Sequence, residues 1–210
     1  MYQIKSLICK GIIPCMIVIW SIFLSTCEKK EVLSDQTARL NFILGDVTID
    51  NLPCKIGQIL NKHSIVTTGK ESIAEIKIGK SSGIQIRENS RAELMNTKKS
   101  WEVLSHKGAI LSLLQKGTHY RIKSPSAVMA VRGTIFYIHT YEDSSEYICT
   151  CNGTVDIMHN ESITKTVSAS HHEGYTASKT ETGQDLEEAP MKEHTDLEIF
   201  EFMYRLEQSE

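Results

Sequence analysis

The fold class of this chain is decided by Lys123-Ser-Pro-Ser-Ala-Val-Met-Ala-Val-Arg-Gly-Thr-Ile-Phe-Tyr-Ile138. This stretch follows an alternating strand, stops at a Ser-Pro turn, and resumes as a second alternating strand from Ile135 to Thr140. Its β-branched residues, the interior Gly133 and the early Pro125 together disfavour a helix. The stretch therefore predicts short β-strands separated by tight turns.

The same pattern extends from about residue 39 to residue 167, where short apolar-alternating runs are bounded by turn residues. Residues 74–78 and 84–86 alternate on either side of a polar turn, which predicts a hairpin, and a strand pair is predicted around Gly45-Asp46. Short strands must bury their apolar faces by stacking, as a sandwich, a barrel or a β-solenoid. The short strands predict an all-β fold class. The even spacing of the turns favours a roll or solenoid among the all-β folds.

The Ser-Pro step, the Ala/Val-rich strand and the Val131-Arg-Gly-Thr134 turn resemble the signature of the FecR family of bacterial envelope proteins. The resemblance extends from about Phe42 to Ile157, and Gly45-Asp46-Val47 is similar to the opening turn of the family. It implies a short-stranded β-roll or solenoid-like domain over residues 39–176. It also implies a non-enzymatic domain outside the cytoplasm that senses a signal by binding a ligand or a partner protein.

Four residues of the signature are expected to be structural: Pro125, Arg132, Gly133 and Thr134. Gly133 would supply a backbone conformation that other residues avoid, and Pro125 would close a sheet edge. Arg132 lies among apolar neighbours, so we expect an internal arginine paired with backbone carbonyls or an acid. The alternative is that Arg132 holds an anionic ligand.

The amino-terminal region predicts a lipoprotein signal peptide over residues 1–26. Two lysines precede the uncharged, almost wholly apolar run Gly11–Leu24, and Leu24-Ser-Thr-Cys27 is similar to a bacterial lipobox. Cys27 would then carry the lipid, followed by a polar tether over residues 27–38. The alternative is an uncleaved amino-terminal anchor. Both interpretations place the domain in the bacterial cell envelope, lipid- or membrane-anchored, and either periplasmic or surface-exposed.

Charge and motifs exclude several functions. Loss of residues 1–26 removes two lysines and changes the formal charge from −3 to −5, which argues against nucleic acid as a partner. The chain has no Gly-x-Ser-x-Gly, no Gly-rich phosphate loop and no His-Glu-x-x-His, so we expect no enzyme activity. Only nine residues precede Lys10, so direct control of a sigma factor by a cytoplasmic domain, as in regulatory FecR proteins, is not expected.

A cluster of cysteines and histidines is the second candidate site. Cys149 and Cys151 are two residues apart on a predicted strand, so their side chains point to one face. Cysteine and histidine are typical ligands of zinc, with iron as an alternative. The candidate ligands are Cys149, Cys151, His171, His172 and His194. The competing interpretation is that both cysteines are core residues and no metal binds.

The carboxy-terminal region changes character. Residues 177–193 are rich in Thr, Ser, Glu and Gly and predict a solvated linker, while residues 194–208 predict a helix capped by Thr195 or Asp196. This helix is apolar on more than one face, so it would pack on the β domain or bind a partner.

The first functional hypothesis is a lipid-anchored FecR-like module that binds another envelope protein or a small ligand. The second is a metal- or redox-responsive envelope protein.

Overall fold

A computed structural model describes residues 37–209 of the chain, apart from residues 98–99, 117–118, 160–161 and 182. The predicted signal peptide over residues 1–26, the lipid-carrying Cys27 and nearly all of the tether lie outside the described residues. The lipobox therefore remains a prediction. Among the described residues, no helix has the length and apolar character needed to cross a membrane.

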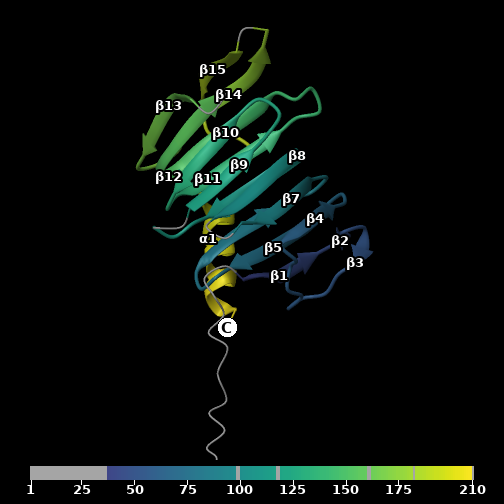
Figure 1. The fold of residues 1–210 in the computed structure, drawn as a ribbon. Helices are drawn as coiled ribbons and strands as arrows, with labels where there is room; N and C mark the ends of the chain where they lie inside the picture. Colours follow the sequence, from purple (N-terminus) through teal and green to yellow (C-terminus); the bar gives the residue numbers. More distant parts are fainter. Residues whose placement is uncertain (1–36, 98–99, 117–118, 160–161, 182, 210) are drawn as a thin grey trace, which may run out of the picture. The chain divides into compact units, whose positions relative to one another are not determined.

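The described residues form fifteen strands followed by one helix, α1 (Figure 1). The predicted all-β fold with a carboxy-terminal helix is therefore confirmed. The elements are β1 Ala38–Leu44, β2 Val47–Ile49, β3 Leu52–Pro53, β4 His63–Thr68, β5 Ile73–Ile78, β6 Ser82–Ile86, β7 Arg91–Asn96, β8 Trp101–Leu113, β9 His119–Lys123, β10 Val128–Arg132, β11 Ile135–Thr140, β12 Glu146–His159, β13 Ser162–Ala169, β14 Glu173–Thr180, β15 Gly183–Ala189 and α1 Asp196–Gln208.

The strands form two sheets that share β8 and β12. Sheet A has the strand order β1-β5-β6-β8-β11-β12-β14-β15. Sheet B has the order β3-β2-β4-β7-β8-β9-β10-β12-β13. Among the described strands, β8 and β9 are the one pair that runs parallel. Strands that pass from one sheet to the other produce the roll-like arrangement that the sequence predicts.

Glycines lie where the two long strands cross between the sheets. Gly108 in β8 has φ +81°, and a Cβ there would lie 2.1 Å from Ser90 Oγ. Gly153 in β12 has φ +108°, and a Cβ would lie 2.8 Å from Thr134 Oγ1. Both positions therefore need glycine for the conformation and for the close approach of a neighbouring segment.

The signature stretch forms a corner between the sheets. Its Ser-Pro step turns β9 into β10, with the Ser124 N–H donating to the Ala127 carbonyl at 2.9 Å. Arg132 ends β10 in sheet B, and the chain continues through Gly133 and Thr134 into β11 of sheet A. The Thr134 hydroxyl donates to the Thr154 carbonyl at 2.9 Å, which ties this corner to β12.

Arg132 was expected to be internal, and this expectation is wrong. Its side chain is exposed and Nη2 lies 3.1 Å from Asp156 Oδ2, so the expected pairing with an acid is present. Arg132 is the last residue of β10, where the chain leaves sheet B, and its guanidinium is exposed to water there. An exposed ion pair of this kind contributes little to stability.

Two apolar cores lie on the two faces of sheet A. The larger core lies between the sheets and includes Ile110, Phe136 and Ile148. The smaller core lies on the opposite face of sheet A, under α1, and it includes Leu111 and Tyr137. Neighbouring residues of β8 and β11 thus alternate between the two cores because successive side chains point to opposite faces.

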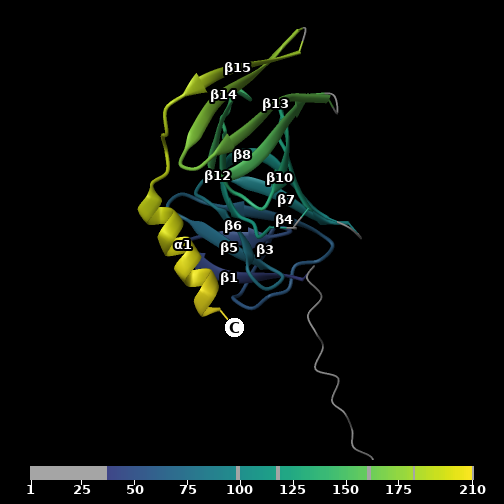
Figure 2. The same cartoon turned by 90° about the vertical axis from the view of Figure 1, so that its left-hand side faces the viewer.

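Helix α1 packs on the outer face of sheet A (Figure 2). Thr195 is the N-cap and forms a capping box with Glu198, which confirms the predicted cap. Ile199, Phe202 and Leu206 are buried, whereas Leu197, Phe200 and Tyr204 are exposed. The helix therefore packs on the β domain through one of its apolar faces.

Two expectations about the chain's organisation are wrong. Residues 177–193 are no linker, because β14 continues to Thr180 and β15 follows as an edge strand. β15 has mostly polar residues and none that is buried, so backbone pairing with β14 forms it without the apolar alternation that marks a strand in a sequence. β1 and β2 do not pair across Gly45-Asp46, because β1 joins β5 in sheet A and β2 joins β4 in sheet B.

Gly133→Val is expected to lower the free energy of unfolding by about 1–3 kcal/mol. Gly133 has φ +64°, and a Cβ there would lie 2.5 Å from Lys116 Cα, so backbone must move to admit a side chain. Gly57→Val is the matched control, because Gly57 has φ +85° but no atom within 4 Å of its Cβ position. Urea unfolding should show the larger loss for Gly133→Val, and equal losses would contradict the packing argument.

Glu146 predicts a pH dependence of stability. Its carboxyl is buried; Oε1 accepts from the Ser126 N–H at 3.0 Å, and Oε2 has no partner among the described groups. Burial raises its pKa above the ordinary 4.5, although the hydrogen bond from Ser126 opposes this. The folded protein therefore keeps the proton to higher pH than the unfolded chain, so the free energy of unfolding decreases as pH rises above 4.5.

Glu146→Gln keeps the shape of the side chain and removes its ionisation, so it should reduce this decrease. The measurement is urea unfolding at about pH 5 and about pH 8 for both proteins. Glu71→Gln is the control at an exposed glutamate and should leave the pH dependence unchanged. The same slope in the wild type and in Glu146→Gln would refute the assignment.

Candidate metal centre

Strand β12 supplies two sulfur donors on the face of sheet A that α1 covers. Cys149 and Cys151 are both buried, and both belong to the core under the helix. Their Sγ atoms lie 4.0 Å apart, so the two thiols are free and face one space. The i, i+2 spacing on a strand gives this arrangement directly.

The turn between β13 and β14 supplies the third donor. β13 pairs with the sheet B half of β12 and β14 with the sheet A half, so this turn crosses over Cys151. His172 has φ +37°, and its N–H donates to the Cys151 carbonyl at 3.1 Å. Its side chain is only 5% exposed, with Nδ1 3.5 Å from Cys149 Sγ.

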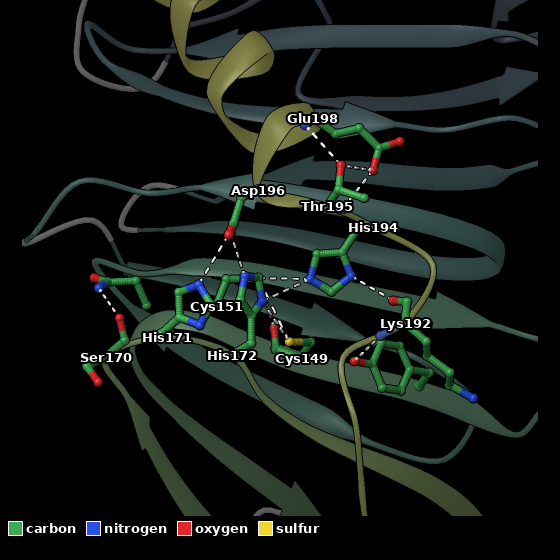
Figure 3. Close-up of polar contacts among 12 residues, drawn as sticks. Cys149, Cys151, Ser170, His171, His172, Lys192, His194, Thr195, Asp196 and Glu198 are labelled. Carbon is green, nitrogen blue, oxygen red and sulfur yellow. Dashed lines mark hydrogen bonds and ion pairs between the residues drawn. The ribbon is translucent and has the colours of Figure 1, made fainter.

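The connection from β15 to α1 supplies the fourth donor. His194 is buried and stacks on Tyr137, with ring centroids 4.3 Å apart. Its Nε2 lies 3.3 Å from Cys151 Sγ and 3.3 Å from His172 Nδ1. Figure 3 shows the two imidazoles and the cysteines converging below the first turn of α1.

Four of the six separations among the donor atoms correspond to edges of a tetrahedral zinc site. Zinc bonds of about 2.3 Å to sulfur and about 2.0–2.1 Å to nitrogen imply edges of about 3.8 Å for S···S, about 3.5 Å for S···N and about 3.3 Å for N···N. The structure has 4.0 Å between the sulfurs, 3.5 and 3.3 Å between sulfur and nitrogen, and 3.3 Å between the nitrogens. All four atoms lie within 4.8 Å of one another.

Hydrogen bonds orient both imidazoles so that a lone pair faces the centre. His194 Nδ1 lies 2.8 Å from the Lys192 carbonyl, which can only accept, so Nδ1 carries the proton and Nε2 is free. His172 Nε2 lies 2.7 Å from Asp196 Oδ1, which leaves Nδ1 free in the neutral ring. A histidine that binds a metal usually donates its other ring N–H to a carboxylate or a backbone carbonyl, which orients the ring.

Without a metal, the charges within the cluster favour the metal-binding form of Cys149 but not that of Cys151 or His172. The thiol of Cys151 donates to the Cys149 sulfur and lowers the pKa of Cys149, against burial, and the two imidazoles lower it further. The same pairing and burial raise the pKa of Cys151. Burial opposes protonation of His172, but its hydrogen bonds with Asp196 and Cys149 outweigh burial and raise its pKa. The thiolate is the form of cysteine that binds metal.

The structure thus brings together four of the five candidate ligands, Cys149, Cys151, His172 and His194. His171 is exposed and lies outside this set, with Nε2 3.2 Å from Asp196 Oδ2. The rings of His171 and His172 contact each other edge to face, and both reach Asp196, but only His172 also reaches a cysteine. The sequence did not predict that Asp196 forms a hydrogen bond with His172, because the two residues are distant in the chain.

Comparison with known proteins identifies the β domain. Residues 64–156 match the family model described as FecR protein. The chain carries a FecR domain. Cys149 and Cys151 lie within the residues matched to the FecR domain, whereas His172 and His194 lie beyond them. The centre therefore joins the FecR domain to the segment that follows it.

Solved structures give a more distant similarity. Two crystal structures of a proposed anti-sigma factor from Parabacteroides distasonis match with TM-scores of 0.49 and 0.48 and 11% identity. Each match covers 60% of this chain, and the chain spans 59% and 58% of the lengths of those two proteins. The comparison with curated proteins gave no match.

Proposed function

We propose that this protein is a non-enzymatic, lipid-anchored FecR-domain protein of the bacterial cell envelope that binds one zinc ion through Cys149, Cys151, His172 and His194. The observation that carries the proposal is the agreement of four of the six donor separations with edges of a tetrahedral zinc site. The FecR domain supports a signal-sensing role, with another envelope protein or a small ligand as the partner. The lipid on Cys27 would hold the domain at the membrane.

A centre with four protein ligands supports a structural or sensing role. Catalytic zinc keeps an open position for water or substrate, whereas four ligands close the coordination shell. The two sulfurs and His194 are buried, which also keeps substrates away. Iron is the alternative metal for the same donors, and analysis of the bound metal distinguishes the two.

The ion would connect three segments that are distant in the sequence: β12, the β13–β14 turn and the β15–α1 connection. His194 immediately precedes the N-cap of α1, so occupancy of the centre would determine where the helix begins on sheet A. A signal could therefore be the presence of the metal itself. This metal-responsive role is favoured by the position of His194 at the start of the helix.

The first test is metal analysis of the full chain purified under reducing, chelator-free conditions. We expect about one zinc per chain in the wild type, because four ligands saturate a single tetrahedral ion. The double variant Cys149→Ser, Cys151→Ser should retain less than about a tenth of that amount. Cys54→Ser is the matched control, because Cys54 lies in another part of the fold with its Sγ 3.4 Å from the Val47 carbonyl.

A wild-type protein that holds no zinc, iron or copper under these conditions would falsify the metal proposal. The cysteines would then be core residues of the face under α1. A chelator provides a second measurement: it should lower the melting temperature of the wild type and of Cys54→Ser but not that of the double variant.

Asp196→Asn is expected to weaken zinc affinity by about tenfold to a hundredfold while stoichiometric binding persists at high zinc. Asp196 holds the ring of His172 through a charged hydrogen bond of 2.7 Å, and an amide holds it less firmly. Competition with a fluorescent chelator measures the change. Asp156→Asn is the control, because Asp156 pairs with Arg132 and is not part of the metal centre. Equal affinities for the two variants would contradict the role of Asp196.

A further inference from the structure

The segment Leu52–Leu60, between β2 and β4, exposes three large aliphatic side chains. Leu52, Ile56 and Ile59 are 66%, 61% and 57% exposed. Leu52 belongs to β3, the edge strand of sheet B, and Ile56 precedes Gly57 in a turn closed by the Gln58 N–H on the Lys55 carbonyl. Three such residues within eight positions are more than scattered surface hydrophobicity explains.

This segment lies beside the start of the β domain. The Leu60 N–H donates to the Ala38 carbonyl at 2.9 Å, and the Leu40 N–H donates to the Gln58 carbonyl at 2.8 Å. Ile59 lies opposite Arg39 in an isolated β-bridge. The exposed aliphatic residues therefore neighbour the point where the chain from Cys27 joins the described structure.

The length of the preceding chain limits the distance between this face and a membrane. Ten residues separate Cys27 from Ala38, and a fully extended chain of that length reaches at most about 35 Å. For an uncleaved apolar segment over residues 11–24, thirteen residues precede Ala38 and the limit is about 45 Å. The segment Leu52–Leu60 is thus on the part of the domain that the chain holds near the lipid.

The charges around the segment have the sign that suits anionic lipid headgroups. Residues 52–63 contain Lys55 and Lys62, both exposed, and no acidic residue, and the nearest acid in the chain is the exposed Asp50 before β3. The exposed apolar stripe of α1 has the opposite surroundings, because Asp196, Glu201 and Glu207 flank it. Basic residues near a bilayer are attracted to anionic lipids, and acidic residues are repelled.

We propose that the segment Leu52–Leu60 rests on the bilayer surface, with Leu52, Ile56 and Ile59 at the boundary between headgroups and acyl chains and Lys55 and Lys62 at anionic headgroups. The proposal depends on the membrane anchoring in the proposed function. It assigns this face of the β domain to the lipid and the exposed stripe of α1 to the aqueous side. Apolar side chains flanked by lysines are typical of interfacial segments.

The test uses the full anchored chain reconstituted into vesicles of phosphatidylethanolamine and phosphatidylglycerol. Ile56→Trp and Ile59→Trp place a fluorescent reporter on the segment, and Leu197→Trp places one on the exposed stripe of α1 as the matched control. The native tryptophans are Trp20, in the amino-terminal segment, and the buried Trp101, and their signal is subtracted with the parent protein. Lipids with brominated acyl chains should quench the reporters at 56 and 59 at least threefold more than the reporter at 197 (about the contrast expected between buried and aqueous positions).

Two further measurements complete the design. The double change Lys55→Glu, Lys62→Glu should reduce quenching at 59 in these vesicles, and less so in vesicles of phosphatidylcholine alone. Labelled fatty acid should enter the wild type but not Cys27→Ala, which tests the lipid anchor separately. Quenching of the reporter at 59 without fatty-acid labelling supports contact of the segment Leu52–Leu60 with the bilayer and assigns the anchor to residues 1–26. Labelling without quenching at 56 and 59, or equal quenching at 197, overturns the proposed surface.

Discussion

Burial of β12 on both faces is the constraint on which the rest of the structure depends. Ile148 faces the core between the sheets, while Tyr147, Cys149 and Cys151 face the core under α1. A strand of sheet A can keep both faces dry only if a second layer covers each of them. Sheet B covers one face, and α1 with the His194 connection covers the other. The same strand then crosses into sheet B at Gly153, so it holds the two sheets together.

Polar contacts set the position of α1 on that outer face. Glu75 in β5 is fully buried and accepts from Arg205 Nε and Nη2 at 2.9 and 2.7 Å, with Gln85 Nε2 at 2.9 Å on the same carboxyl oxygen. Removal of one partner of a buried ion pair destabilises a protein by about 3–5 kcal/mol, because the other charge is left unpaired. Lys77 Nζ donates to the Leu206 carbonyl at the carboxy-terminal end of the helix. The helix is therefore held in one register by specific groups as well as by its apolar face.

The amino-terminal end of α1 is held by the Cys/His cluster instead. His194 and Asp196 flank the N-cap Thr195, and both contact His172. In the structure the four donor groups contact one another through hydrogen bonds. A bound ion would replace these hydrogen bonds and the shared proton of the two thiols. The centre and the ion pair at Glu75 would thus act at opposite ends of one helix.

Local sequence was sufficient for several elements of this structure. Alternation and turn residues identified the β5–β6 hairpin, the Ser-Pro turn and the positive φ at Gly133, because each depends on neighbouring residues only. Spacing on a strand likewise placed Cys149 and Cys151 on one face. The sequence could not distinguish His171 from His172, since the choice depends on how the β13–β14 turn crosses β12.

The sequence by itself thus determined the all-β class, the capped helix and the paired sulfurs, which follow from periods of two or 3.6 residues and from turn chemistry, while the family signature rested on resemblance. Only the tertiary structure decided that β15 is a strand, because its polar residues gain order from pairing with β14. It also decided that Asp196 supports His172 and which face of α1 is buried, because these contacts join residues more than twenty positions apart. Long-range packing has no local pattern, and the donor cluster is a product of that packing.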